Sequence, residues 1–136
     1  MRRLAVGLML VTIVACGSDS TTEPQNGPLA GTYLLRTVNA KGLPTIAYPD
    51  PTQPITIAYG RVVLNADFSF VDSTVYTYPS GGVQQSESDV YKGTYVQDGD
   101  HITFHIPGNP NTYSMAWTAG NALTFVTDEL TFLYRK

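Results

Sequence analysis

The residues of this 136-residue sequence that are best suited to bind a metal ion or transfer a proton are its two histidines, His101 and His105. They are four residues apart on a predicted strand, which places them on one face but about 13 Å apart. Ligands of one metal ion lie about 2 Å from a common centre, so this spacing argues against a shared site. The intervening Ile102 and Phe104 face the opposite side of the strand and are expected in the core. We therefore expect both histidines to face solvent, and we expect no bound metal and no cofactor.

Acidic pairs are the other candidates for chemistry. Glu87 with Asp89, and Asp128 with Glu129, are the residue types that glycosidases use as paired carboxylates. Nothing in the sequence places either pair in a cleft, and exposed surface is the ordinary location of such residues. The chain also contains no Gly-x-Ser-x-Gly motif and no glycine-rich phosphate loop before a helix. The sequence therefore predicts a protein that is not an enzyme.

The reactive side chain with the most informative position is Cys16, the only cysteine of the chain. It follows the basic start Met1-Arg2-Arg3 and a run of twelve residues, Leu4–Ala15, that is almost entirely apolar. Twelve helical residues rise only about 18 Å, whereas the hydrocarbon core of a bilayer is about 30 Å thick. The segment is therefore typical of a secretory signal peptide and not of a transmembrane helix. A lone cysteine in an exported protein has no internal disulfide partner and needs another role.

The residues around this cysteine, Ile13-Val14-Ala15-Cys16-Gly17, resemble the lipobox of bacterial lipoproteins. The resemblance implies that residues 1–15 are a signal peptide cleaved before Cys16. It also implies acyl chains on Cys16 that anchor the protein in a membrane of the cell envelope. Because Gly17 and Ser18, and not Asp, come directly after the cysteine, the resemblance implies the outer membrane, with the domain facing the periplasm or the cell surface. The alternative is an ordinary leader that happens to end near a cysteine.

A tether and one folded domain account for the rest of the chain. Residues 16–28 have no aliphatic or aromatic side chain after the cysteine and cannot bury enough surface to fold. The composition changes at Leu29, and residues 29–136 are about the length of a single domain. The whole chain has 43% hydrophobic residues, 14% charged residues and a formal net charge of −3, which argues against nucleic-acid binding. We expect a monomer.

The domain has the period-two alternation of antiparallel strands and no helical periodicity over eleven or more positions. Short polar turns such as Ser80-Gly81-Gly82 separate most of the strands, which favours successive hairpins. The long irregular connection is Lys41–Pro54, whose prolines exclude a central strand. The pattern predicts an all-β, up-and-down antiparallel β-barrel of about eight strands, with a two-sheet β-sandwich as the alternative. The predicted strands are Gly31–Asn39, Ile55–Leu64, Phe68–Tyr78, Val83–Val96, His101–Ile106, Thr112–Trp117, Ala122–Thr127 and Glu129–Arg135.

Several short motifs run through the domain, among them Gly31-Thr32-Tyr33-Leu34-Leu35, Tyr91-Lys92-Gly93-Thr94-Tyr95 and Phe132-Leu133-Tyr134-Arg135-Lys136. They resemble the small lipocalin-like domains of bacterial lipoproteins. In lipocalins the first strand opens with Gly-x-Trp, whose ring closes one end of the barrel beneath an arginine of the last strand. Here Gly31 and Tyr33 match that pattern, with Tyr in place of Trp, and Arg135 is the expected partner. The resemblance implies a lipocalin-like barrel over residues 29–136.

A barrel of eight strands can be filled with side chains or can hold one small ligand. Aromatic side chains with a polar tip suit the mouth of a ligand pocket, and we predict Tyr33, Tyr113, Met115 and Trp117 as ligand-binding residues. We expect a lipid-anchored, non-catalytic barrel that binds a small hydrophobic or amphipathic ligand. The alternative is a structural or protein-interaction module of the cell envelope with a filled core. Its contact surface would be the tyrosine-bearing strands or the Lys41–Pro54 loop.

Overall fold

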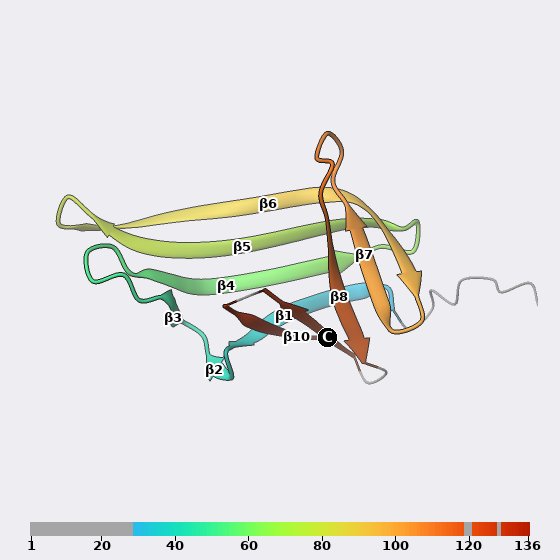
Figure 1. Ribbon diagram of the computed structural model, residues 1–136, viewed down its shortest axis with the longest axis horizontal. Coiled ribbons are helices and arrows are strands. Elements are labelled where there is room, and N and C mark those ends of the chain that lie inside the picture. Colours follow the sequence, from blue (N-terminus) through green and yellow to red (C-terminus); the bar gives the residue numbers. More distant parts are fainter. Residues whose placement is uncertain (1–28, 119–120, 128) are drawn as a thin grey trace, which may run out of the picture.

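A computed structural model describes residues 29–118, 121–127 and 129–136, which form one antiparallel sheet (Figure 1). The expected signal peptide, Cys16, the tether and Asp128 lie outside these residues. The described part of the chain contains ten strands and no helix. The strands are β1 (Gly31–Val38), β2 (Lys41–Gly42), β3 (Thr45–Tyr48), β4 (Ile55–Leu64), β5 (Ser69–Ser80), β6 (Val83–Asp98), β7 (His101–His105), β8 (Thr112–Thr118), β9 (Ala122–Val126) and β10 (Thr131–Arg135).

The sheet closes into a barrel. Its order is β2-β1-β10-β9-β8-β7-β6-β5-β4-β3, and β1 also pairs with β4, from Gly31 opposite Leu64 to Leu34 opposite Arg61. Eight strands therefore form the ring, and the short strands β2 and β3 extend from β1 and β4. The predicted all-β, up-and-down antiparallel barrel is confirmed. A two-sheet sandwich is excluded because a single sheet pairs back onto itself.

Two local differences from the prediction have simple causes. The segment Lys41–Pro54 is not wholly irregular, because it contains β2 and β3. Both strands pair on one side only, so the nearby prolines interrupt no central ladder. Phe68, predicted to begin a strand, has a φ of 65° and belongs to the turn before β5. There its N–H donates to the carbonyl oxygen of Asn65 at 3.2 Å.

The strands of the barrel differ greatly in length. β5 and β6 contain 12 and 16 residues, whereas β7, β9 and β10 contain five each. In Figure 1, β4, β5 and β6 run side by side across the molecule, and the β5–β6 hairpin projects beyond the shorter strands. β6 pairs with β7 only over Thr94–Asp98, and a Cβ at the preceding Gly93 would overlap the carbonyl oxygen of His105. Toward the β5–β6 turn, the part of β6 that precedes Gly93 therefore has β5 on one side and no β7 on the other.

The other end of the barrel is filled with side chains. Tyr33 from β1 is fully buried there, and its hydroxyl donates to the carbonyl oxygen of Leu29 at 2.6 Å. Tyr95 from β6 is also buried, and its hydroxyl donates to the carbonyl oxygen of Asn65 at 2.8 Å. These bonds satisfy the polar tips of two large buried rings. Further residues that are at most 1% exposed are Leu29, Val38, Val62, Leu64, Phe70, Ile102, Phe104, Met115 and Leu123.

A cation covers the filled end, but it is not the residue predicted. The Nζ atom of Lys136 lies 5.6 Å from the centroid of the Tyr33 ring. The Lys136 side chain also lies over Gly31, where a Cβ would overlap it. Arg135, the expected partner, is exposed instead. Alternate residues of a strand face opposite sides, and because Tyr134 faces the interior, Arg135 faces away from it.

Candidate ligand-binding site

The end of the barrel opposite Tyr33 contains two adjoining cavities, of about 340 and 300 Å³. The larger lies between the β3–β6 side of the wall and strands β9 and β10, and the smaller extends toward the β7–β8 connection. Both are lined by Asp72, Tyr91 and Phe125, so we call them together the mouth cavity. Their volumes fall at the lower end of the range typical of small-ligand pockets.

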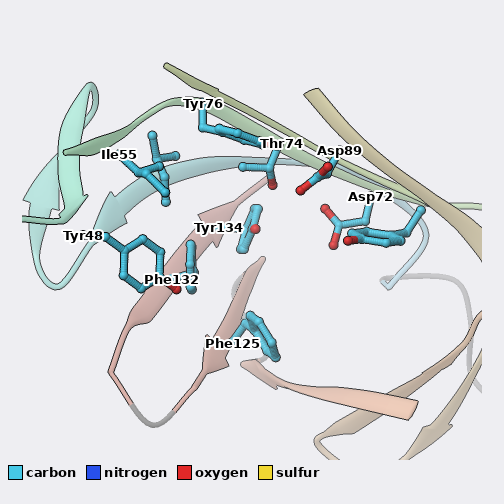
Figure 2. A pocket seen from close by; sticks show the side chains of 11 residues that line it. Tyr48, Ile55, Asp72, Thr74, Tyr76, Asp89, Phe125, Phe132 and Tyr134 are labelled. Carbon is cyan, nitrogen blue, oxygen red and sulfur yellow. The ribbon is translucent and has the colours of Figure 1, made fainter. Parts of the chain in front are cut away.

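Strand alternation explains which side chains reach this cavity. On β5, Phe70 is buried in the core and the residues in phase with it are Asp72, Thr74 and Tyr76, all of which line the mouth cavity. On β6, Tyr91 lies opposite Asp72 in the ladder, which brings its side chain to the same face. Figure 2 shows the side chains of this wall on one side of the cavity, across from rings contributed by β9 and β10. Asp72 therefore lies at the boundary where the packed core ends and the cavity begins.

Aromatic rings form most of the opposite wall. Phe125 of β9 lies 5.6 Å from Tyr113 of β8 and 5.8 Å from Phe132 of β10, measured between ring centroids. Tyr113 in turn stacks on the buried Phe104 at 4.7 Å. These contacts hold the rings of the cavity against the core, so the wall is preorganised and presents ring faces to the interior of the cavity.

Asp72 is the most unusual residue of the cavity, because only 9% of it is exposed although it carries a carboxylate. Its Oδ2 accepts a hydrogen bond from the Tyr113 hydroxyl at 3.1 Å. Its Oδ1 is buried and has no hydrogen-bond partner among the described residues. Burial raises the pKa of Asp72 to about 6, and the bond from Tyr113 partly opposes that rise. At neutral pH the cavity therefore contains an ionised carboxylate with one unused acceptor atom.

The tyrosine hydroxyls near Asp72 remain protonated. Burial is the main cause that raises the pKa of Tyr113, and the negative charge of Asp72 raises it further. The same two causes, in the same order, raise the pKa of Tyr134. Tyr113 is therefore a hydrogen-bond donor to Asp72 over the whole range in which the carboxyl titrates.

Further carboxylates lie at the rim of the cavity, on the projecting β5–β6 hairpin. Glu87 accepts hydrogen bonds from the hydroxyls of Tyr76, at 3.1 Å, and of Tyr78. These bonds are the main cause that raises the pKa of both tyrosines. Asp89 lines the cavity itself. Among the described residues that line the mouth cavity there is no Lys, Arg or His, so its charged groups are all acidic.

The structure places the four predicted ligand-binding residues at different ends of the barrel. Tyr113 lines the mouth cavity. Tyr33 and Met115 are buried in the filled end, and Trp117 is half-buried and packs against that core. A ligand role for these three stays a prediction that the position of the cavity does not support. Asp72 was missed, although its phase with Phe70 on a predicted strand marks it as an inward-facing acid.

Of the described residues considered for other chemistry, Asp89 is exposed but lines the mouth cavity, and the others lie on the surface. His101 and His105 are exposed, as predicted, and the Nε2 of His101 lies 3.4 Å from Asp100 Oδ1. Glu129 is also exposed. Within the described ranges, no group of three or more His, Cys, Asp or Glu side chains could hold a metal ion.

Comparisons of this chain with models of protein families, with curated proteins and with solved structures find no match. The described residues include no helix long and apolar enough to cross a membrane.

Proposed function

We propose that this protein is a lipid-anchored component of a bacterial cell envelope whose non-catalytic barrel binds one small amphipathic ligand in the mouth cavity. The observation that carries the proposal is the combination of aromatic walls with one buried, incompletely paired carboxylate, Asp72. Concave sites with mostly apolar walls and a few convergent polar groups are the usual form of small-molecule sites. The lipocalin-like topology supports the same conclusion by analogy only.

The energetic cost of Asp72 supports a functional role for it. Burying a carboxylate without full hydrogen bonding destabilises a fold, so such groups are uncommon unless they are used. Proteins concentrate locally unfavourable residues at functional sites and compensate for them elsewhere. In this barrel the compensation is the close packing of the filled end, where the buried Tyr33 and Tyr95 hydroxyls both have partners, although the buried Nε1 of Trp117 has none among the described residues.

Binding fits the cavity better than catalysis does. The partner of Asp72 is Tyr113, whose raised pKa makes it a donor and not a base at neutral pH. Catalysis by an acid–base pair would need a second group that titrates near neutral pH within hydrogen-bond reach of the reacting atoms. Asp89, the other acid of the lining, is exposed. We therefore propose a ligand carrier or sensor without chemistry of its own.

Native mass spectrometry of the full-length protein, purified from bacterial membranes into nanodiscs, tests ligand binding. We expect a reproducible added mass of a few hundred daltons. Thr74→Phe, which fills the cavity from β5, should remove this mass, whereas Thr77→Phe, on the other face of the same strand, should retain it. A ligand-free wild type, together with no binding of any apolar or amphipathic probe, would contradict the proposal.

Fractionation of a Cys16→Ser variant tests the lipid anchor. Because Cys16 is the only cysteine, its loss should give an unprocessed precursor or a soluble product, and Ser18→Ala should behave as wild type. If the Cys16→Ser variant is still found as a mature membrane protein, the lipoprotein proposal is wrong.

The open edge of β6 favours a second candidate function, which is binding of another envelope protein. Residues Val83–Lys92 are all exposed, and among the described strands they pair with β5 alone. A free strand edge can accept a strand from a partner protein. A photo-crosslinking residue at Val90 should then trap one protein partner in cells, and Thr74→Phe should leave the crosslink unchanged. Absence of a specific crosslink would remove this candidate.

A further inference from the structure

The unpaired oxygen of Asp72 indicates what a ligand must supply. Asp72 is nine-tenths buried, and its Oδ2 already accepts a hydrogen bond from Tyr113. The free Oδ1 is an acceptor, because an ionised carboxylate has no proton to donate. A ligand group that pairs with this carboxylate must therefore offer a hydrogen-bond donor. A positively charged donor satisfies it best, because charge-assisted hydrogen bonds are roughly twice as strong as neutral ones.

The aromatic walls suit the same kind of group. Rings line the mouth cavity on both sides, with Tyr91 and Tyr76 from the β5–β6 wall and Phe125, Phe132 and Tyr134 from the opposite strands. Figure 2 shows Tyr134 and Phe125 on the side of the cavity across from Asp72. The face of an aromatic ring attracts a cation through its quadrupole and also packs against an apolar body. Rings and a carboxylate together form a typical environment for an organic cation.

The remaining charges in the neighbourhood have the same sign. Asp89 lines the cavity, and Glu87 holds the hydroxyls of Tyr76 and Tyr78 at the rim. No basic side chain of the described residues lines the cavity to neutralise Asp72. A concave site with charges of one sign concentrates ligands of the opposite sign. A fatty acid or another anion would meet like charge in a poorly solvated site, which opposes its binding.

A bare metal ion does not fit the same space. Hard cations such as Ca²⁺ require six to eight oxygen ligands, and even Mg²⁺ is usually bound through more than one carboxylate or phosphate group. The described residues contain no group of three metal-ligating side chains, and the walls around Asp72 are mainly aromatic. An organic cation needs only the one carboxylate, because its apolar body is held by the rings.

From these observations we propose that the mouth cavity binds an organic cation, a protonated amine or ammonium group on a small apolar body, with Asp72 as its counter-ion. This inference rests on the proposed ligand-binding function. The cationic group lies against the Asp72 carboxylate at the floor of the cavity, and the apolar body extends between Tyr91 on one wall and Phe132 and Tyr134 on the other. Rings alone would hold a quaternary ammonium group, whereas an N–H donor also uses the carboxylate.

Four probes of similar size and different head group test this inference. They are 4-phenylbutylamine, its trimethylammonium analogue, 4-phenylbutanol and 4-phenylbutanoate, titrated into the full-length protein in zwitterionic nanodiscs at pH 7.5, with empty nanodiscs as the blank. We expect the amine to bind at least about tenfold more tightly than the alcohol, and the carboxylate to bind most weakly. Tighter binding of the amine than of the trimethylammonium probe would assign an N–H donor to the Asp72 carboxylate, and the reverse order would assign a quaternary cation.

Two variants with the same change of formal charge show whether Asp72 is responsible. Asp72→Asn should remove the preference for the amine and leave binding of the alcohol within about twofold of wild type. Asp98→Asn, at the exposed end of β6 and outside the cavity, should keep the preference. If the alcohol binds as tightly as the amine, or if Asp72→Asn keeps the preference, the cation inference is wrong while ligand binding stands. If none of the four probes binds and the purified wild type carries no added mass, the proposed function fails as well.

Discussion

The two ends of this barrel are built from the same strands but have opposite properties. At the filled end, Tyr33 is fully buried, its hydroxyl has a partner, and Lys136 lies over its ring. At the open end, Asp72 is buried with one oxygen unpaired, and aromatic rings surround a cavity. A single closed sheet can therefore hold a close-packed core at one end and a cavity with a buried carboxylate at the other.

Strand length is the physical origin of this difference. At the filled end large buried side chains, among them Tyr33, Tyr95 and Phe104, pack together in the interior. At the open end β5 and β6 continue past Gly93 without β7 beside them, and their inward faces have no full complement of side chains to pack against. The stability of the first end allows the second to keep groups that weaken the fold.

The largest effect is expected from truncation at the filled end. Tyr33→Ala should lower the free energy of unfolding by about 3–5 kcal/mol, because it leaves a cavity in a close-packed region. Phe132→Ala, at the half-buried wall of the mouth, should cost less than about 2 kcal/mol. Urea unfolding of the two variants measures both values. Equal losses would show that the two ends do not differ in packing as described.

Removal of the charge of Asp72 should stabilise the protein. The pKa of about 6 in the folded state lies above the ordinary 3.8, so folding favours the protonated carboxyl. The stability that protonation provides is present below about pH 4 and is lost as the pH rises through 6. Asp72→Asn should therefore match wild type near pH 4 and exceed it by up to about 3 kcal/mol at pH 7.5. A destabilised variant at pH 7.5 would contradict this description of the open end.

The hydroxyl groups of the two ends should differ in their dependence on pH. Tyr113→Phe removes a bond to a carboxylate and should cost about 2 kcal/mol at pH 7.5, and less near pH 4 where Asp72 is neutral. Tyr33→Phe removes a bond to a carbonyl oxygen and should cost about 1 kcal/mol at both pH values. Unfolding curves at the two pH values give this contrast. If the cost of both substitutions depended on pH in the same way, the Tyr113 hydroxyl would not differ from the Tyr33 hydroxyl in bonding a titrating group.

The smallest effect is expected at the surface of the filled end. Lys136→Ala removes the cation over the Tyr33 ring and should cost about 0.5 kcal/mol, because exposed cation–π contacts are weak. Lys136→Arg should restore the loss. A much larger change would mean that Lys136 holds the end of the barrel together through more than this contact.

Ligand binding should also depend on pH if Asp72 is the counter-ion. Asp72 faces Tyr113 from β8, Tyr134 from β10 and Tyr91 from β6, and Asp89 of β6 lines the same cavity. The raised pKa values of Tyr113 and Tyr134 keep both neutral near pH 6. The affinity for 4-phenylbutylamine should therefore fall about tenfold from pH 7.5 to 5, as Asp72 gains its proton. The affinity for 4-phenylbutanol should stay nearly constant.

Much of the fold could be predicted from the sequence, because strand alternation and turn residues are local signals. The phase of Ile102 and Phe104 correctly placed both in the core and put His101 and His105 outside. The short polar turns correctly indicated successive antiparallel strands. Arg135 was assigned the wrong face, since its neighbour Tyr134 faces inward.

The candidate site could be predicted only in part. Tyr113 was found because a strand tyrosine suits a pocket mouth, but the same argument also selected Tyr33, which lies in the filled end. The alternation that marks a residue as inward-facing is identical at both ends of a barrel. The sequence can therefore identify inward-facing residues, but it does not show how far along the barrel axis each one lies.

The sequence by itself determined that this domain consists of successive antiparallel strands and indicated many of the side chains that face its interior, because a period of two and turn chemistry act over a few residues. Only the tertiary structure decided that the sheet closes into a barrel, and which end of that barrel is filled and which is open. That outcome depends on where β6 parts from β7 and on the closure of β1 onto β4, which join segments distant in the chain. The burial of Asp72 follows from both, since one residue of β5 lies at the boundary between packed core and open cavity.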